Sequence, residues 1–249
     1  MDDHSHDDVR RPVDDFHTTR WSIVVRAGDR LQPGAAAALE ELCNRYWTAV
    51  YAYVRRRTRD VETAQDRTQA FFADLLERNL PAAADPERGR FRAFLLTSVK
   101  HFLLNEHARE QTQRRGGGVR RLSLDFGDGE SRLRCEPADD ATPEHLFERR
   151  WALTLLETVI ARLEREYDAP AKRRHFELLR PALAGDKERL PYGEIGMELG
   201  LSAEAARQAA TRLRRRYREL LRSEIAETVA DPEDVDDEIR RLFEVLGRG

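Results

Sequence analysis

Apolar residues recur at steps of three and four along most of this chain, and that spacing constrains the fold more than any other feature of the sequence. Between Ala35 and Arg57 the apolar positions are Leu39, Leu42, Cys43, Tyr46, Val50, Tyr53 and Val54. Steps of three and four place side chains on one face of an α-helix, whereas a strand needs strict alternation. The segment is therefore predicted to be an amphipathic core helix.

The same period predicts further helices over residues 61–78, about 91–113, 144–163 and 171–184. The intervening segment Asn79–Arg90 contains two prolines and a glycine and is expected to be a loop. Hydrophobic residues make up 40% and charged residues 36% of the chain, a composition that suits helices with large solvated faces. We predict an all-α fold.

A chain of 249 residues fits two small helical domains. Residues 119–143 are polar and acidic and lack a helical period, so we expect a flexible linker there. Thr142 and Pro143 have the chemistry of an N-cap followed by a first helical residue. The predicted organisation is an N-terminal extension (1–34), a first helical domain (35–115), a linker (116–143), a second helical domain (144–222) and an acidic C-terminal extension (223–249).

The charge of the chain is unevenly distributed, although the net charge is only -3. Residues 100–121 carry six basic residues against two glutamates, and residues 201–222 carry seven arginines against two glutamates. Residues 223–249 carry nine carboxylates against three arginines. One basic block in each domain predicts two separate contacts with phosphate backbone, the alternative being ordinary solvated helix faces.

The segment Leu190–Leu220 is typical of a helix-turn-helix. Gly196 is a small residue that allows close packing, and Gly200 stands where the turn needs a positive φ. Leu201 is expected to fill the angle between the two helices, and Ser202 to cap the second one.

The second helix of this segment is predicted to present a polar face. Its apolar side consists of Ala206, Ala209, Ala210, Leu213, Tyr217 and Leu220. The side chains left outside suit the base edges and phosphates of a DNA major groove, and with the capping serine they are Ser202, Glu204, Arg207, Gln208, Thr211, Arg212 and Arg215. A helical hairpin without a role in DNA binding is the alternative.

Other classes of protein fit the sequence less well. His101 and His107 are six residues apart, not at the i, i+4 spacing of a helical zinc pair, and no glycine-rich phosphate loop or nucleophile elbow occurs. We therefore predict no catalytic residue, metal or cofactor. No window reaches the roughly 18 apolar residues of a membrane span, and the acidic start differs from a secretory signal, so a cytoplasmic protein with reduced Cys43 and Cys135 is expected.

Three segments resemble, in the same order, the conserved regions of a known family. DRTQAFF at Asp66–Phe72 resembles the "D-L-T-Q-E-x-F" signature of region two in sigma-70 factors, and Arg90–Glu110 looks like the part of region two that melts and reads the minus-ten element. Residues 190–221 are similar to region four, which reads the minus-thirty-five element. With no domain between them, the chain resembles the minimal, extracytoplasmic-function (ECF) group, and TRWS, RGRFRAFLL and FERRWALTLLE resemble a planctomycete and myxobacterial subgroup in which some members sit beside Ser/Thr kinases.

The resemblance implies a non-enzymatic sigma factor that binds core RNA polymerase at the β′ clamp and the β flap and directs promoter-specific initiation. Carried over by position, the polymerase-binding residues are Asp66, Thr68, Gln69, Phe72 and Asp74. Those for the melted minus-ten strand are Arg88, Arg90, Phe91, Lys100, His101, Asn105 and Arg109. The helix-turn-helix residues named above would read minus-thirty-five DNA. The rival reading is a stand-alone helix-turn-helix regulator that binds duplex DNA without polymerase.

The sequence departs from the family pattern in the docking signature. Arg67 and Ala70 replace an apolar and an acidic residue, which weakens the acidic face. A Ser/Thr kinase that phosphorylates Thr63 or Thr68 would restore negative charge, and an anti-sigma factor is a further partner left open. The acidic C-terminal extension is expected either to mask a DNA-binding face or to cap the second domain.

Overall fold

A computed structural model describes residues 21–112, 124, 126–134, 141–184, 190–229 and 231–247, and the fold is given for these residues. The first part of the chain forms a bundle of four α-helices with two short 3-10 helices between the last two. Its elements are α1 (Trp21–Gly28), α2 (Ala35–Arg57), α3 (Val61–Glu77), η1 (Leu80–Ala83), η2 (Pro86–Arg88) and α4 (Phe91–Thr112). The described residues contain no strand, which confirms the all-α prediction within them.

Helix α2 lies at the centre of the molecule. Every residue from Tyr46 to Val54 is buried, because α1 and α3 pack on one side of the helix and α6 on the other. The bounds of α2 are those predicted from its apolar stripe. Burial on all sides is typical of a helix enclosed by a larger core rather than lying on a surface.

A helix occurs inside the segment predicted to be a flexible linker, so that prediction is wrong for residues 126–134. Helix α5 (Phe126–Arg134) contacts α2 through Phe126, whose ring centroid lies 5.7 Å from that of Trp47 and 5.3 Å from that of Tyr51. The Tyr51 hydroxyl donates a hydrogen bond of 2.9 Å to Glu130. The rest of the predicted linker, apart from residues 124 and 141–143, lies outside the described residues.

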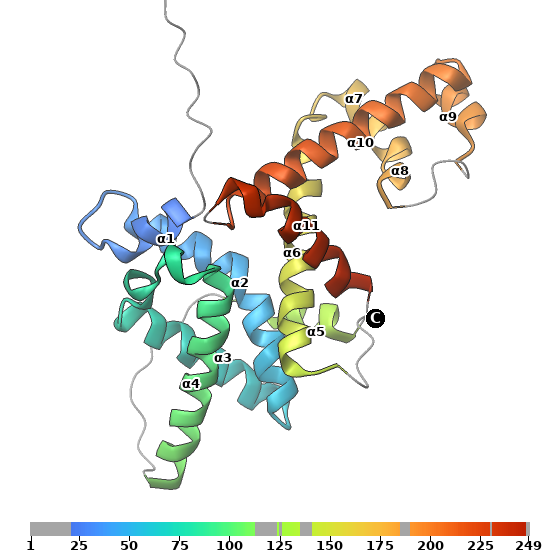
Figure 1. Cartoon of the computed structure of the whole chain (residues 1–249). Coiled ribbons are helices and arrows are strands. Elements are labelled where there is room, and N and C mark those ends of the chain that lie inside the picture. Colours follow the sequence, from blue (N-terminus) through green and yellow to red (C-terminus); the bar gives the residue numbers. More distant parts are fainter. Residues whose placement is uncertain are drawn as a thin grey trace, which may run out of the picture.

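Helix α6 (Pro143–Arg165) joins the two parts of the fold. Thr142 accepts a hydrogen bond from the His145 amide at 3.2 Å and Pro143 follows it, as predicted. The helix lies along α2, where the hydroxyls of Thr48 and Thr154 are 3.1 Å apart, and it also contacts α10. One hydrophobic core therefore continues across the predicted domain boundary (Figure 1).

A second group of helices, which includes the segment predicted to be a helix-turn-helix, extends from α6 as an arm (Figure 1). It consists of α7 (Pro170–Leu179), α8 (Pro181–Ala184), α9 (Tyr192–Leu199) and α10 (Ala203–Ala226). The single helix predicted over residues 171–184 is interrupted after Leu179, because Pro181 has no backbone N–H with which to continue the ladder.

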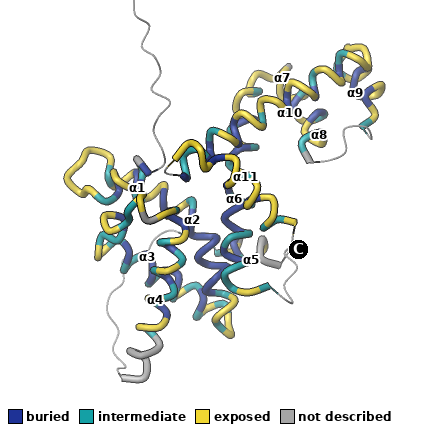
Figure 2. The backbone as a smooth tube through the Cα atoms, viewed as in Figure 1, coloured by how far each residue is buried: buried dark blue, intermediate teal, exposed yellow. Residues whose placement is uncertain are grey.

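The acidic C-terminal extension is folded in the described residues. After η3 (Pro232–Asp234), helix α11 (Val235–Gly247) packs on α6 and α10 and buries Val235 and Leu242. Three acidic residues in its first turn face the positive end of the helix dipole. Figure 2 shows buried stretches on α2 and α6, while much of α10 and α11 is exposed. No described helix is long and apolar enough to cross a bilayer.

Candidate nucleic-acid interface

The turn between α9 and α10 is built by two glycines and a serine, as predicted. Gly200 has φ 66° and ψ 31°, in the left-handed region. A Cβ on Gly196 would lie 2.7 Å from the Leu201 carbonyl oxygen, so only glycine allows this approach. The Ser202 hydroxyl accepts a hydrogen bond of 3.1 Å from the Ala205 amide and caps α10.

The prediction that the Leu201 side chain fills the angle between the helices is wrong. Its exposed fraction is 38%, because its backbone carbonyl, rather than its side chain, lies against Gly196. The buried apolar residues of this part are supplied by the helices themselves, with Ile195 on α9 and Ala206, Ala210 and Leu213 on α10.

The predicted outward face of α10 is exposed, which confirms its orientation. The exposed residues are Ser202, Glu204, Arg207, Gln208, Thr211, Arg212 and Arg215. Arg207 is held by its neighbours: its guanidinium carbon lies 5.4 Å from the centroid of the Tyr192 ring, and it forms a 2.7 Å ion pair with Glu204. Sequence reasoning missed Tyr192, which is buried under this arginine.

One arginine of the run Arg214–Arg216 is bound to another part of the protein at its surface. Arg216 donates hydrogen bonds to Glu166, the residue after α6, through its Nε and one terminal nitrogen, with a shortest distance of 2.7 Å. The hydrogen bonds that Arg216 donates to Glu166 and Glu219 raise its pKa. This residue therefore ties α10 to the end of α6.

The expected polymerase-binding residues on α3 divide between surface and core. Asp66 is exposed, while Gln69 and Asp74 are half-buried, and Asp74 forms a 2.7 Å ion pair with Arg78. These residues belong to the surface of α3.

Thr68 and Phe72 correct that expectation, because both are core residues. Thr68 is fully buried and donates a hydrogen bond of 2.8 Å to the Ala64 carbonyl, so it presents no hydroxyl to a polymerase or a kinase. Phe72 is buried with its ring against Phe71. Thr63 is half-buried at the start of α3, and its hydroxyl donates a 2.9 Å hydrogen bond to Asp60.

The expected strand-binding residues lie around the start and one face of α4. His101 and Asn105 are exposed, whereas Lys100 forms a 2.8 Å ion pair with Glu144 of α6. Arg90 forms a 2.7 Å ion pair with Glu238 of α11. The side chains of Arg88 and Arg109 lie outside the described part of the chain.

Phe91 was expected to stack on a base, and the structure corrects this. It is 6% exposed and packs edge-on against Tyr46, with centroids 5.4 Å apart, and against Trp21 at 6.1 Å. The aromatic ring at the start of α4 anchors the helix in the core.

Arg92, two residues further on, is a charged residue that sequence reasoning missed. It is 6% exposed, forms a 2.7 Å ion pair with Glu148 of α6, and also pairs with Glu238. Its guanidinium lies 4.2 Å from the centroid of the Trp151 ring. Burial disfavours its charge, but the two carboxylates outweigh burial and raise the pKa.

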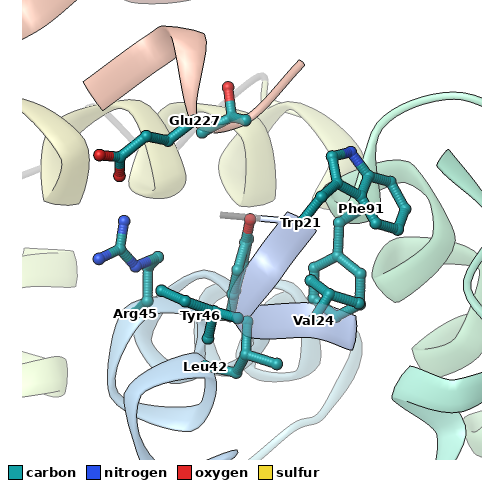
Figure 3. Close-up of a pocket in the computed structure, with 9 residues that line it drawn as sticks. Trp21, Val24, Leu42, Arg45, Tyr46, Phe91 and Glu227 are labelled. Atoms are coloured by element: carbon teal, nitrogen blue, oxygen red, sulfur yellow. The ribbon is translucent and has the colours of Figure 1, made fainter. Parts of the chain in front are cut away.

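A small pocket lies where α1, α2 and the start of α4 meet the end of α10 (Figure 3). Its wall includes Trp21, Arg45, Tyr46, Phe91 and Glu227, and its volume of about 20 Å³ suits a single water rather than a ligand. The described residues contain no group of three or more His, Cys, Asp or Glu side chains that could hold a metal ion.

Residues 42–113, which span most of α2, all of α3 and all of α4, match the model of the family described as sigma-70 region 2. No curated protein and no solved structure matches the chain. The match covers the residues of α3 that were expected to bind polymerase and those of α4 that were expected to bind the open strand. Residues 42–113 thus form a sigma-70 region 2 domain, and a domain of this kind implies binding to core RNA polymerase and recognition of the minus-ten promoter element.

Proposed function

We propose that this chain is a minimal sigma factor of the ECF type, which directs promoter-specific transcription initiation with two DNA-reading parts. The observation that carries the proposal is the order of the parts: a region 2 domain is followed by two helices joined by a tight turn, α9 and α10, and α10 exposes a polar, arginine-rich face. A factor of this kind works in the cytoplasm, with the polymerase and the chromosome.

Docking on polymerase is assigned to the exposed side of α3. Asp66, Gln69 and Asp74 lie on this side and supply carboxylate and amide groups for the β′ clamp helices. The β flap is the expected partner of the helix-turn-helix part. Because Thr68 and Phe72 are core residues, they contribute to docking by keeping α3 in place.

Capture of the melted minus-ten strand is assigned to the loop before α4 and to its exposed face. His101 and Asn105 offer stacking and hydrogen bonding to unstacked bases, and Lys100 and Arg90 offer positive charge to the backbone. No bond is made or broken, since binding to the open strand shifts the duplex toward melting.

Reading of the minus-thirty-five duplex is assigned to α10. A helix of this kind enters the major groove with its N-terminal residues against base edges. Arg207 stands in that part of α10, and an arginine fork binds guanine through two acceptors. Arg212 and Arg215, further along, are placed for phosphates.

The test is run-off transcription with purified core polymerase, the full chain and genomic DNA fragments. Gln69→Ala should weaken polymerase binding, and Arg207→Ala should weaken promoter choice by about 1 to 3 kcal/mol if the arginine reads a base. Arg173→Ala is the matched control, because Arg173 is an exposed arginine of the same arm that pairs with Asp168 at 2.9 Å. Absence of any promoter-specific transcript with the wild-type chain would refute the proposal.

A stand-alone duplex-binding regulator is the second candidate, and one observation favours it. The polar face of α10 is open in this structure, whereas Arg90 and Lys100 are paired with carboxylates of α11 and α6. A regulator would give the same footprint on duplex DNA with or without core polymerase. A sigma factor would give a promoter footprint that depends on polymerase and on Gln69.

Regulation by a Ser/Thr kinase is proposed at Thr63 alone, while an anti-sigma factor stays an open prediction. Thr63 precedes Arg67 by one helical turn, and a phosphate there would face this arginine. The pairing would offset the positive charge that departs from the family signature. Thr63→Glu should raise affinity for core polymerase, measured by anisotropy of the labelled chain, and Thr63→Ala should leave it at the unmodified level.

A further inference from the structure

Two buried carboxylates of the C-terminal part are fastened to arginines of the region 2 domain. Glu238 of α11 is fully buried and pairs with both Arg90 and Arg92. Glu224, near the end of α10, is 1% exposed and pairs with Arg45 of α2 at 3.7 Å and with Arg162 of α6 at 3.1 Å. The acidic extension therefore reaches the first half of the chain through specific ion pairs, not through diffuse charge.

Arg90 takes part in one of these ion pairs and also belongs to the surface that we propose to bind the open strand. It is the last residue of the loop assigned to the open strand and immediately precedes α4. Its Nε lies 2.7 Å from a Glu238 oxygen, and its side chain is 22% exposed. Carboxylate and phosphate are both anions that a guanidinium binds, so Glu238 and a DNA phosphate would compete for Arg90.

We propose that α11 competes within the molecule for the strand-binding surface, with Glu238 occupying at Arg90 the place of a DNA phosphate. The inference rests on the proposed function of Arg90. In the closed state Glu238 holds Arg90, and binding of the open strand requires α11 to leave.

The attachment of α11 is suited to reversible release. The helix has 13 residues, a length at which an isolated helix is marginal in water. It is held by the buried side chains of Val235 and Leu242, by the ion pair between Asp236 and Arg222, and by a 3.2 Å hydrogen bond from Arg149 to the Leu246 carbonyl. Loss of the Glu238 pairs would remove the ion pairs that join α11 to Arg90 and Arg92.

The competing explanation is a permanent structural cap, and the two make different predictions for DNA binding. A cap that is removed or weakened lowers stability and leaves the affinity of a folded chain for DNA unchanged or reduced. A competitor that is weakened raises the affinity, and the rise depends on Arg90.

The experiment measures binding of the full-length chain to a fluorescein-labelled single strand of random sequence, about 20 nucleotides long, by anisotropy at low salt. Glu238→Gln keeps the side-chain shape and removes the charge, and it should raise affinity about fivefold or more. Leu242→Ala loosens α11 without touching a carboxylate and should act in the same direction. Glu244→Gln is the matched control, since Glu244 is an exposed glutamate of the same helix and its loss should change nothing beyond the general charge effect.

Combining Arg90→Ala with Glu238→Gln should abolish the gain. Unchanged affinity in Glu238→Gln and Leu242→Ala chains that keep their helical circular dichroism would overturn the inference. An equal gain with Glu244→Gln would overturn it as well, because it would show a nonspecific effect of net charge. Run-off transcription with core polymerase distinguishes the failure of the two proposals. If the wild-type chain is inactive, the proposed function is refuted. If the wild-type chain is active and Glu238→Gln does not change its activity, only the proposed competition is refuted.

Discussion

Replacing Gly196 with alanine tests how α9 is held against the turn that leads into α10. The added Cβ would lie 2.7 Å from the Leu201 carbonyl oxygen and 3.2 Å from the carbonyl carbon and oxygen of Ser202. All three atoms belong to the backbone of the turn, so no side chain can rotate out of the way. The start of α10 must therefore move away from α9.

The expected magnitude follows from two opposing contributions. Alanine is favoured over glycine inside a helix by about 1 kcal/mol, while overpacking of a tight contact costs roughly 1 to 3 kcal/mol, with a backbone clash at the upper end. The net loss of unfolding free energy should be about 1 to 2 kcal/mol. For a chain of this size that lowers the melting temperature by about 2 to 8 °C.

Gly193→Ala is the matched control, because Gly193 lies in the same helix and an added Cβ there meets nothing within 4 Å. It should leave stability unchanged or raise it by up to about 1 kcal/mol. Urea unfolding followed by circular dichroism gives both values, and duplex binding by the folded variants reports the displacement of α10. Wild-type stability in Gly196→Ala, or an equal loss in Gly193→Ala, would refute the packing argument.

Three further predictions concern single contacts. Tyr192→Leu should weaken promoter binding by about 0.5 to 1 kcal/mol through loss of the ring under Arg207, and Tyr192→Phe should restore it; equal losses in both variants, in a footprint titration, would exclude the ring as the cause. Burial, reinforced by Glu40, raises the pKa of the Cys43 thiol to about 12. In a Cys135→Ser chain at pH 8, alkylation of Cys43 by iodoacetamide should therefore be at least about a hundredfold slower in the folded protein than in urea. Comparable rates in the two states would contradict this. The hydrogen bond from Lys100 lowers the pKa of Glu144 below its ordinary 4.5, so ionised Glu144 stabilises the folded protein above its unfolded pKa, and this stabilisation is lost as pH falls through its folded pKa. The difference in unfolding free energy between wild type and Glu144→Gln should therefore shrink in acid. A difference that grows in acid would show the opposite sign.

Local features of the fold were predictable because their causes lie within a few residues. The bounds of α2, the Thr142 cap before Pro143, the positive φ of Gly200 and the Ser202 cap each depend on neighbouring side chains and backbone. The exposed face of α10 was predictable for the same reason, since helical period alone decides which side faces outward.

Features that depend on distant partners were not predictable from the sequence. Helix α5 lacks an apolar stripe of its own, and its burial comes from Trp47 and Tyr51 on α2. From the sequence alone, Phe91 and Phe72 could each lie at the surface or in the core. The positions of the other helices decide that both are buried.

The partners of Arg92 show this limit most clearly. Glu148 and Glu238 are remote from it in the chain, and an arginine followed by apolar residues carries no signal of a buried ion pair. Charge composition did indicate that the acidic extension would meet basic residues, but not which ones.

The burial of α2 on all sides has a consequence for synthesis on the ribosome. Its far side is covered by α6, which begins at Pro143, long after Arg57 has been translated. At a translation rate of about 5 to 20 residues per second, α6 is synthesised on the order of ten seconds after α2, and the apolar side of α2 stays uncovered until then. During that interval the nascent chain exposes the apolar face of α2 to aggregation. A chaperone that binds this face on the ribosome would raise the yield of folded protein.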